Sequence, residues 1–213
     1  SENTFSPLID SLFKTQSTFF DRYSNFRNFY KIQIIYTQID RDENNVPSFN
    51  NHTWRLSPEE YFNPASFVKI PASIFALEKI NNQLSQYGAD KYCPLIFEKN
   101  YDCEEPEAKD STCICQYPNI AHYVKRALIV SENSPYKRLY EFLGQEYIQN
   151  KIASIGFDGS RIVQRFASDC DEEGNRYTNA VNFFDFDSTL VYRQPEQYNA
   201  NYVRTPDSTF MVG

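Results

Sequence analysis

The chain has 213 residues and a mass of 25.0 kDa, a size that corresponds to one domain because chains usually divide only beyond about 250 residues. Its hydrophobic fraction of 41% and aromatic fraction of 16% exceed what disordered segments carry, so we expect it to fold. The formal net charge of -7 has the wrong sign for a protein that binds a phosphate backbone. No run reaches the roughly 18 apolar residues of a membrane span. We therefore expect no nucleic-acid partner and no membrane span.

The first predicted element is an amphipathic helix that begins at Ser6 and Pro7 and runs to about Tyr23, because an apolar stripe with i, i+4 spacing follows the proline. Residues 31–40 are rich in β-branched and aromatic side chains, and residues 48–54 follow across a polar turn. This pattern predicts two antiparallel strands. Two strands alone make a marginal sheet, so they either pair with strands absent from this chain or the tail contains strands that its pattern does not reveal.

Helical signals dominate the middle of the chain. Apolar residues keep a three-to-four spacing over residues 70–84 and 120–128, which predicts two helices that bury these stripes. A third helix is predicted over residues 134–144, from a serine and proline at its start to a glycine at its end, and a fourth over about 145–156. The tail beyond Thr178 is aromatic with weak periodicity, and no further strands are predicted there.

These elements predict a single α+β domain over residues 1–213. The helix and two strands occupy residues 1–57, a helical subdomain that carries the candidate site residues occupies 58–180, and an irregular tail occupies 181–213.

The cysteines allow two interpretations, because most of them lie in one polar, acidic stretch. A zinc site would normally show Cys-x2-Cys pairs or paired histidines, whereas this chain has one Cys-x-Cys and only two histidines. Disulfide bonds are favoured, since they fit a loop too polar to be held by a core and an exported protein. The odd number leaves at least one thiol free or paired elsewhere. The pairing is open among Cys93, Cys103, Cys113, Cys115 and Cys170.

Several enzyme classes lack their motifs here. The chain has no Gly-x-Ser-x-Gly elbow, no P-loop and no dinucleotide-binding fingerprint. A Ser-His-Asp triad needs a histidine base, but His52 falls in a predicted strand and His122 lies early in an apolar-striped helix, where a packed or half-exposed residue is favoured. What remains is a serine nucleophile that uses lysine as its base.

The pattern Ser-x-x-Lys places a hydroxyl and an amine on one helix face, about 5 to 6 Å apart at Cβ. It begins at Ser11, Ser66 and Ser134, so context must choose among the three. Ser11 lies inside the first helix, and Ser134 is explained by helix capping. Ser66 follows a loop and leads through Lys69 into an apolar stripe. We therefore expect Ser66 to be the nucleophile and Lys69, kept partly neutral by burial, to accept its proton.

The run over residues 61–80 resembles the active-site helix of the class A β-lactamase and penicillin-binding serine hydrolase superfamily. Further along the chain, Ser131, Glu132 and Asn133 resemble the second motif of that family, Ser-Asp-Asn. Residues 176–179 resemble the segment that closes the omega loop of the family, so the likeness spans roughly residues 25 to 185.

The resemblance implies a role for each matching residue. Ser66 would be acylated, with its own backbone N–H as half of an oxyanion hole, and Lys69 would accept its proton. Ser131 would relay a proton to the leaving nitrogen, and Asn133 would bind the amide side chain of the substrate. Glu132 replaces the aspartate of the family and keeps a supporting carboxylate. The resemblance implies no metal and no cofactor.

The chain departs from the family in its omega loop. Family β-lactamases carry a glutamate there that activates the deacylating water. The corresponding stretch, residues 165–176, is shorter and has no matching glutamate, so Asp169, Glu172 and Glu173 are candidate bases, with a solvated acidic turn as the favoured alternative. Without a positioned base, an acyl-enzyme would form and hydrolyse slowly.

A second departure is the absence of the Lys-Thr/Ser-Gly triplet that grips the substrate carboxylate in the family; the nearest miss begins at Lys14. The family fold, an α+β protein with a three-layer α/β/α sandwich, also has three more strands and a final helix. We therefore expect this chain to be the N-terminal portion of a longer protein, with a C-terminal segment as a partner and the remaining sheet strands absent.

The resemblance implies a serine hydrolase that opens a β-lactam ring, as in antibiotic resistance, or acts on a D-alanyl peptide of the cell wall. The alternative is a penicillin-binding or catalytically silent relative that binds without turnover. The partner would be this small molecule or cell-wall peptide. Because such substrates are met outside the cytoplasm, a periplasmic or exported protein is expected.

Overall fold

The computed structural model describes residues 6–57, 60–114, 116–163, 165–166 and 168–201. The chain forms two compact units, Ser1–Asn63 and Pro64–Gly213. The described residues combine six α-helices with small antiparallel sheets, which confirms the α+β class. Among the helices of these residues, none has the length and apolar character required to cross a membrane.

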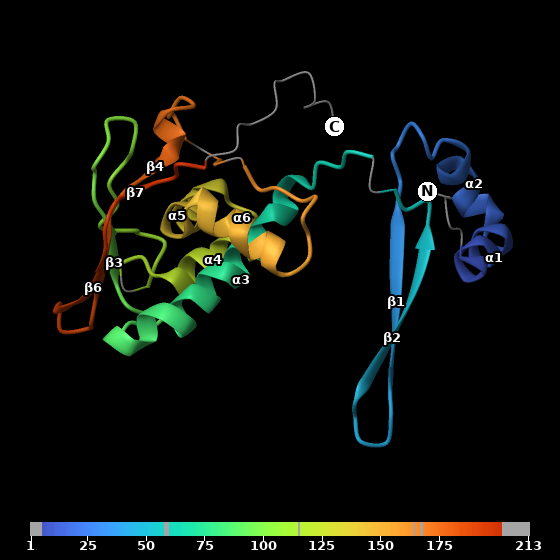
Figure 1. Ribbon diagram of the computed structural model, residues 1–213, viewed down its shortest axis with the longest axis horizontal. Helices are drawn as coiled ribbons and strands as arrows, with labels where there is room; N and C mark the ends of the chain where they lie inside the picture. The colour runs from blue at the N-terminus through green and yellow to red at the C-terminus, as the bar shows by residue number, and fades with distance from the viewer. Residues whose placement is uncertain (1–5, 58–59, 115, 164, 167, 202–213) are drawn as a thin grey trace. The chain divides into compact units, whose positions relative to one another are not determined.

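The first unit contains two short helices and a β-hairpin (Figure 1). Strands β1 (Ile34–Arg41) and β2 (Pro47–Trp54) pair antiparallel with Ile34 opposite Trp54, which confirms the two predicted strands. The ring of Phe13 lies 4.9 Å from that of Trp54. The apolar stripe of the first helix therefore packs against the base of the hairpin.

The single helix expected up to about Tyr23 is instead two helices, α1 (Pro7–Thr15) and α2 (Ser17–Asn25), separated at Gln16. The Thr15 hydroxyl donates to the Ser11 carbonyl at 2.8 Å. Serine and threonine side chains compete with the backbone for hydrogen bonds, and this break falls in a run of such residues. The prediction of one continuous helix is wrong for this reason.

The second unit is built around α5 (Asn133–Leu143), in which every residue from Pro135 to Leu143 is buried. Helices α3 (Lys69–Lys79), α4 (Ile120–Ile129) and α6 (Gln145–Ser154) all contact it (Figure 1). These four helices confirm the helical block that the sequence predicts. A central helix that is buried after its first two residues gives the unit a rigid support for groups at its ends.

Helix α3 buries a different face from the one that its isoleucines predict. Ala72 and Ala76 are fully buried, whereas Ile70 is 43% exposed and Ile74 is 56% exposed. Small side chains let neighbouring helices approach closely, which favours burial of the alanine face. The expected burial of the stripe holds only for its C-terminal part, where Ile80 and Leu84 are buried.

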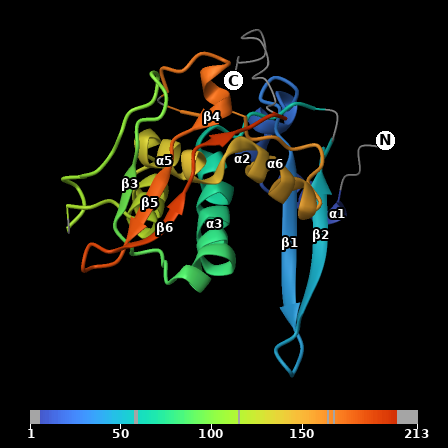
Figure 2. The same cartoon turned by 60° about the vertical axis from the view of Figure 1, so that its left-hand side comes forward.

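The tail contains strands that its weak periodicity does not predict. Strands β3 (Leu95–Phe97), β5 (Val181–Phe184) and β6 (Leu190–Gln194) form an antiparallel sheet in the order β3-β5-β6. Figure 2 shows β5 and β6 side by side near α5. The rings of Phe142 on α5 and Phe183 on β5 lie 5.5 Å apart, so the sheet packs on the central helix.

A further pair of short strands, β4 (Tyr177–Thr178) and β7 (Gln197–Tyr198), is antiparallel. The expected irregular tail over 181–213 is therefore wrong for the part that β5, β6 and β7 occupy, while residues 202–213 lie outside the described residues. The expectation that strands beyond the first two are absent from this chain is wrong as well. Strands this short give too few alternations to be recognised in a sequence.

Candidate active site

Ser66 lies in a short 3-10 turn, η1 (Ala65–Val68), that runs directly into α3. The Phe67 N–H donates to the Pro64 carbonyl at 3.0 Å, which closes the turn. Pro71 is the third residue of α3, where its missing N–H leaves no hydrogen bond unmade. The sequence expectation that Pro71 fixes a helix start near Ser66 is confirmed.

The amine of Lys69 is the centre of the site. Its Nζ lies 3.4 Å from Ser66 Oγ, 3.1 Å from Ser131 Oγ and 2.8 Å from Asn133 Oδ1, and it also donates to the Ser131 carbonyl. The residue is only 1% exposed. The structure thus brings three predicted site residues, Ser66, Ser131 and Asn133, together around the buried amine of a fourth, Lys69.

Two of these positions carry backbone strain. Ala65, directly before Ser66, has φ of 45°, and Ser131 has φ of 54°. Residues other than glycine adopt such conformations at a cost of order 1–3 kcal/mol, and they persist only where the surroundings hold them. Strain of this kind on both sides of Lys69 indicates that the placement of the two hydroxyls is imposed by the fold.

Ser131 and Asn133 reach Lys69 from the junction between two helices. Ser131 follows α4, and Asn133 is the first residue of the buried helix α5. Glu132 lies between them and pairs with Arg126 of α4, with its Oε2 2.5 Å from Arg126 Nη2. This ion pair ties the end of α4 to the start of α5 and fixes the loop that carries both groups.

The electrostatics of Lys69 contain two opposing effects. Burial lowers the pKa of Lys69, and the nearby carboxylate of Glu132 raises it by a smaller amount. The balance is a lowered pKa, which increases the neutral fraction of the amine near pH 7. A neutral amine beside a hydroxyl is what a lysine base requires.

The three acids predicted as deacylation bases lie on the surface. Asp169, Glu172 and Glu173 are all exposed, and Glu173 pairs with Arg176 at 3.0 Å. The described side chain of this stretch that lies near the amine is Phe166, with its ring centroid 5.9 Å from Lys69 Nζ. The group that this stretch places near the amine is therefore an aromatic ring, whereas the resemblance predicted a carboxylate.

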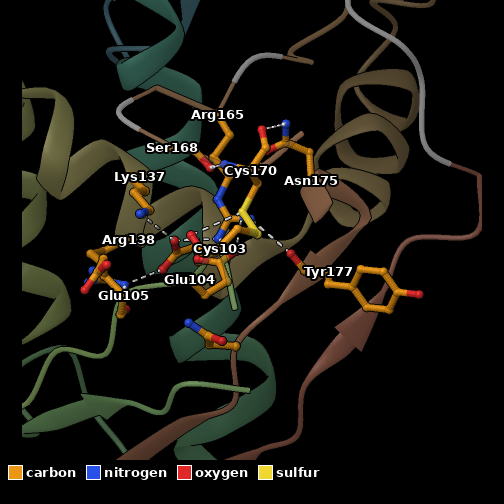
Figure 3. A network of polar contacts seen from close by, with 12 residues as sticks. Cys103, Glu104, Glu105, Lys137, Arg138, Arg165, Ser168, Cys170, Asn175 and Tyr177 are labelled. Carbon is orange, nitrogen blue, oxygen red and sulfur yellow. Dashed lines mark hydrogen bonds and ion pairs between the residues drawn. A yellow bond between two sulfur atoms is a disulfide. The ribbon is translucent and has the colours of Figure 1, made fainter. Parts of the chain in front are cut away.

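Phe166 is held in place by its neighbours. Its ring centroid is 4.8 Å from that of Tyr136, which is fully buried in α5. The preceding residue, Arg165, pairs with Glu104 and donates to the Tyr177 carbonyl at 3.0 Å (Figure 3). It also donates to Glu141 at 2.5 Å. Sequence reasoning missed Phe166 and this ion network, because nothing in the local pattern distinguishes them from ordinary core and surface residues.

The ion network around Arg165 is buried, and its two carboxyl groups, of Glu104 and Glu141, have pKa values shifted in opposite directions. Burial and, to a smaller extent, the neighbouring Glu141 together raise the pKa of Glu104 to about 7, although Arg165 opposes this rise. Burial alone would raise the pKa of Glu141 as well, but Arg165 and Arg138 outweigh it and lower that pKa. Glu141 therefore carries the negative charge, and Glu104 titrates near neutrality.

The favoured interpretation of the cysteines, disulfide bonding, is confirmed for one pair, because Cys103 bonds to Cys170 (Figure 3). Cys103, Glu104 and Cys170 also form a cluster of metal-ligand type, but the two sulfurs are bonded to each other. Cys93 is a buried free thiol, and Cys113 is buried as well. The remaining cysteine, Cys115, lies outside the described residues.

Neither predicted histidine belongs to the site. His122 Nε2 lies 2.9 Å from Asp110 Oδ2 in the polar loop before α4. His52 Nδ1 lies 2.9 Å from Ser6 Oγ in the first unit. Both contacts support a structural role, as the sequence favours.

Comparisons of the chain with protein-family models, with curated proteins and with solved structures found no match.

Proposed function

We propose that this protein is a serine hydrolase that acts through an acyl-enzyme and has a β-lactamase/transpeptidase-like three-layer α/β/α architecture. The observation that carries the proposal is the convergence of Ser66 Oγ, Ser131 Oγ and Asn133 Oδ1 on the buried Lys69 Nζ. The strained conformation of Ala65 next to the nucleophile supports it.

The contacts define how Lys69 would act as a base. A neutral amine has two N–H groups and one lone pair. Asn133 Oδ1 and the Ser131 carbonyl are the nearest acceptors of the Lys69 Nζ, so they occupy its N–H groups. The lone pair is then free to accept the proton of Ser66 Oγ, which attacks the substrate carbonyl.

Breakdown of the tetrahedral intermediate needs a proton on the leaving nitrogen. Ser131 Oγ, 3.1 Å from Lys69 Nζ, can pass on its proton and recover one from the protonated amine. The backbone N–H of Ser66 would donate to the oxyanion. The product of this half-reaction is an ester of Ser66, and no metal or cofactor takes part in the proposal.

The substrate class that fits this chemistry is a β-lactam or a D-alanyl peptide of the cell wall, because both present an acyl carbon bonded to a leaving nitrogen. Asn133 would bind an amide group of such a substrate. A periplasmic or exported location is part of the proposal, since these substrates are met there.

A second candidate function, binding without turnover, is favoured by one specific observation. The ring of Phe166 lies 5.9 Å from Lys69 Nζ, while Asp169, Glu172 and Glu173 are exposed. A ring cannot activate water, so the acyl-enzyme would be long-lived. That is the behaviour of a penicillin-binding protein rather than of a resistance enzyme.

The test is covalent labelling with a fluorescent penicillin, followed by peptide mass spectrometry. We expect one adduct, on Ser66, with a lifetime of minutes or longer. Ser66→Ala should abolish it, and Lys69→Met should slow its formation by about 10²–10⁴-fold, the usual contribution of a general base.

Ser11→Ala provides a matched control, because Ser11 begins another Ser-x-x-Lys pattern in α1. This variant should label at the wild-type rate. Labelling that survives in Ser66→Ala, or its absence from folded wild-type protein, would contradict the hydrolase proposal.

A further inference from the structure

The segment that carries Phe166 has few backbone constraints of its own. The described residues between α6 (Gln145–Ser154) and the 3-10 turn η4 (Gly174–Arg176) belong to no helix or strand. Its position therefore depends on side-chain links. The two strongest described links are the ion pairs of Arg165 and the disulfide from Cys170 to Cys103.

The disulfide and the ion pairs converge on the same place (Figure 3). Cys103 precedes Glu104, whose carboxylate pairs with Arg165, and Cys170 Sγ lies 3.7 Å from Glu104 Oε1. The disulfide joins residues 67 positions apart, so it supplies a connection that the local chain cannot. Fixing Cys170 to the loop that carries Glu104 also fixes the partner of Arg165.

The ion pairs hold this segment less securely than their number suggests. Glu104 Oε2 and Arg165 Nε are buried and have no hydrogen-bond partner among the described residues. Unsatisfied buried polar atoms favour opening, because water would satisfy them. The covalent link therefore opposes a local tendency of this network to open.

We propose that the Cys103–Cys170 disulfide is a reducible clamp that holds Phe166 over Lys69, so that reduction by a dithiol loosens residues 165–176 and exposes the amine to water. Cys103 is only partly buried. The loosening of the segment on reduction does not depend on the proposed hydrolase function. Only the effect of reduction on acylation rests on that function.

The chemistry of the step is thiol–disulfide exchange. A thiolate of the dithiol attacks one sulfur of the Cys103–Cys170 bond and forms a mixed disulfide with that cysteine. The second thiol of the reductant then attacks the mixed disulfide and releases the cysteine. The protein gains two electrons and two protons as Cys103 and Cys170 become thiols. The dithiol is oxidised to its own disulfide, so no other reactant is needed.

The first test measures structure without any substrate. Hydrogen exchange followed by mass spectrometry is compared for oxidised protein and protein kept in dithiothreitol. We expect amides of residues 168–176 to exchange at least ten-fold faster after reduction, while those of α4 (Ile120–Ile129) stay unchanged. Unchanged exchange over 168–176 would overturn the clamp.

The second test measures the link to the site. Reduction should slow labelling of Ser66 by a fluorescent penicillin several-fold near pH 7, because a more hydrated Lys69 is less often neutral. Phe166→Ala should label slowly in both redox states. Loosening of the segment without any change in wild-type labelling would overturn the connection to Lys69.

A matched control separates this clamp from the other cysteines. The double variant Cys103→Ser, Cys170→Ser should resemble reduced protein and should not respond to dithiothreitol, although it retains Cys93 and Cys113. A response of that variant to dithiothreitol would show that another group causes the effect, and it would overturn the proposal. If wild-type protein never labels, the hydrolase function fails, while the exchange result still decides the clamp.

Discussion

At the scale of single residues, Lys69 is controlled by two groups that act in opposite directions. The ring of Phe166 contributes to the burial that lowers the pKa of Lys69, and the carboxylate of Glu132 raises that pKa. Because acylation needs the neutral amine, its rate should rise with pH through the pKa of Lys69. The position of that rise reports on both neighbours.

We predict that two variants shift this pH profile in opposite directions. Phe166→Ala admits water to the amine, so the pKa of Lys69 and the midpoint of the profile should move up. Glu132→Gln removes the negative charge, so the midpoint should move down. The measurement is the rate of Ser66 labelling by penicillin between pH 5 and 10.

Shifts in the same direction for both variants would contradict this account of Lys69. Glu132→Gln also weakens the ion pair with Arg126, so its thermal unfolding should be recorded beside the wild type. A change confined to the maximal rate, with the midpoint unmoved, would indicate misplacement of the Ser131 loop instead.

At the scale of elements, the turn after Cys170 packs directly on the disulfide. A Cβ at Gly174 would lie 2.9 Å from Cys103 Sγ and 3.1 Å from Cys170 Cβ. Glycine is required here for close approach, because a Cβ would crowd Cys103 Sγ and Cys170 Cβ. The turn thus begins after the disulfide-bonded Cys170 and continues through η4 into β4.

We predict that Gly174→Ala lowers the free energy of unfolding by about 1–3 kcal/mol, the usual range for overpacking. Gly159→Ala is the matched control, because a Cβ there would meet open space. Urea unfolding of both oxidised proteins measures the difference. Equal stability of the two variants would show that the turn moves away from the disulfide without strain.

At the scale of the whole molecule, a buried lysine joins three elements of the second unit. Lys79 on α3 is 7% exposed, and its Nζ donates to the Phe142 carbonyl of α5 and to Gln194 Oε1 of β6, both at 2.7 Å. Burial lowers the pKa of Lys79 from its ordinary 10.5 to about 7. The folded protein therefore releases a proton there that the unfolded chain keeps.

The sign of the resulting pH dependence follows from proton binding. Between pH 7 and about 10 the unfolded chain binds more protons at Lys79, so the free energy of unfolding should increase with pH. From pH 7 to 9 the increase should be about 2 kcal/mol for this one group. Below about pH 6 both states hold the proton, and the contribution should be flat.

Urea unfolding at pH 6, 7, 8 and 9 tests this expectation. Lys79→Met removes the titrating group, so its stability should lack the increase that the wild type shows. The difference between the two proteins isolates Lys79 from other groups that titrate in this range. Parallel curves for the wild type and Lys79→Met would contradict the role assigned to burial.

The sequence by itself determined the local features of this protein. The hairpin of β1 and β2, the helix start near Ser66 and the spacing of Ser66 and Lys69 all follow from contacts between nearby residues. Propensity, capping and an i, i+3 spacing decide such features, and each can be recognised in a short window.

Only the tertiary structure decided the rest. It set the distances from Lys69 to Ser131 and Asn133, the partner of Cys103, and the place of Phe166. These contacts join residues more than sixty positions apart, so they form only once distant segments pack together. Packing selected the alanine face of α3 over its isoleucines, and no local pattern contains that choice.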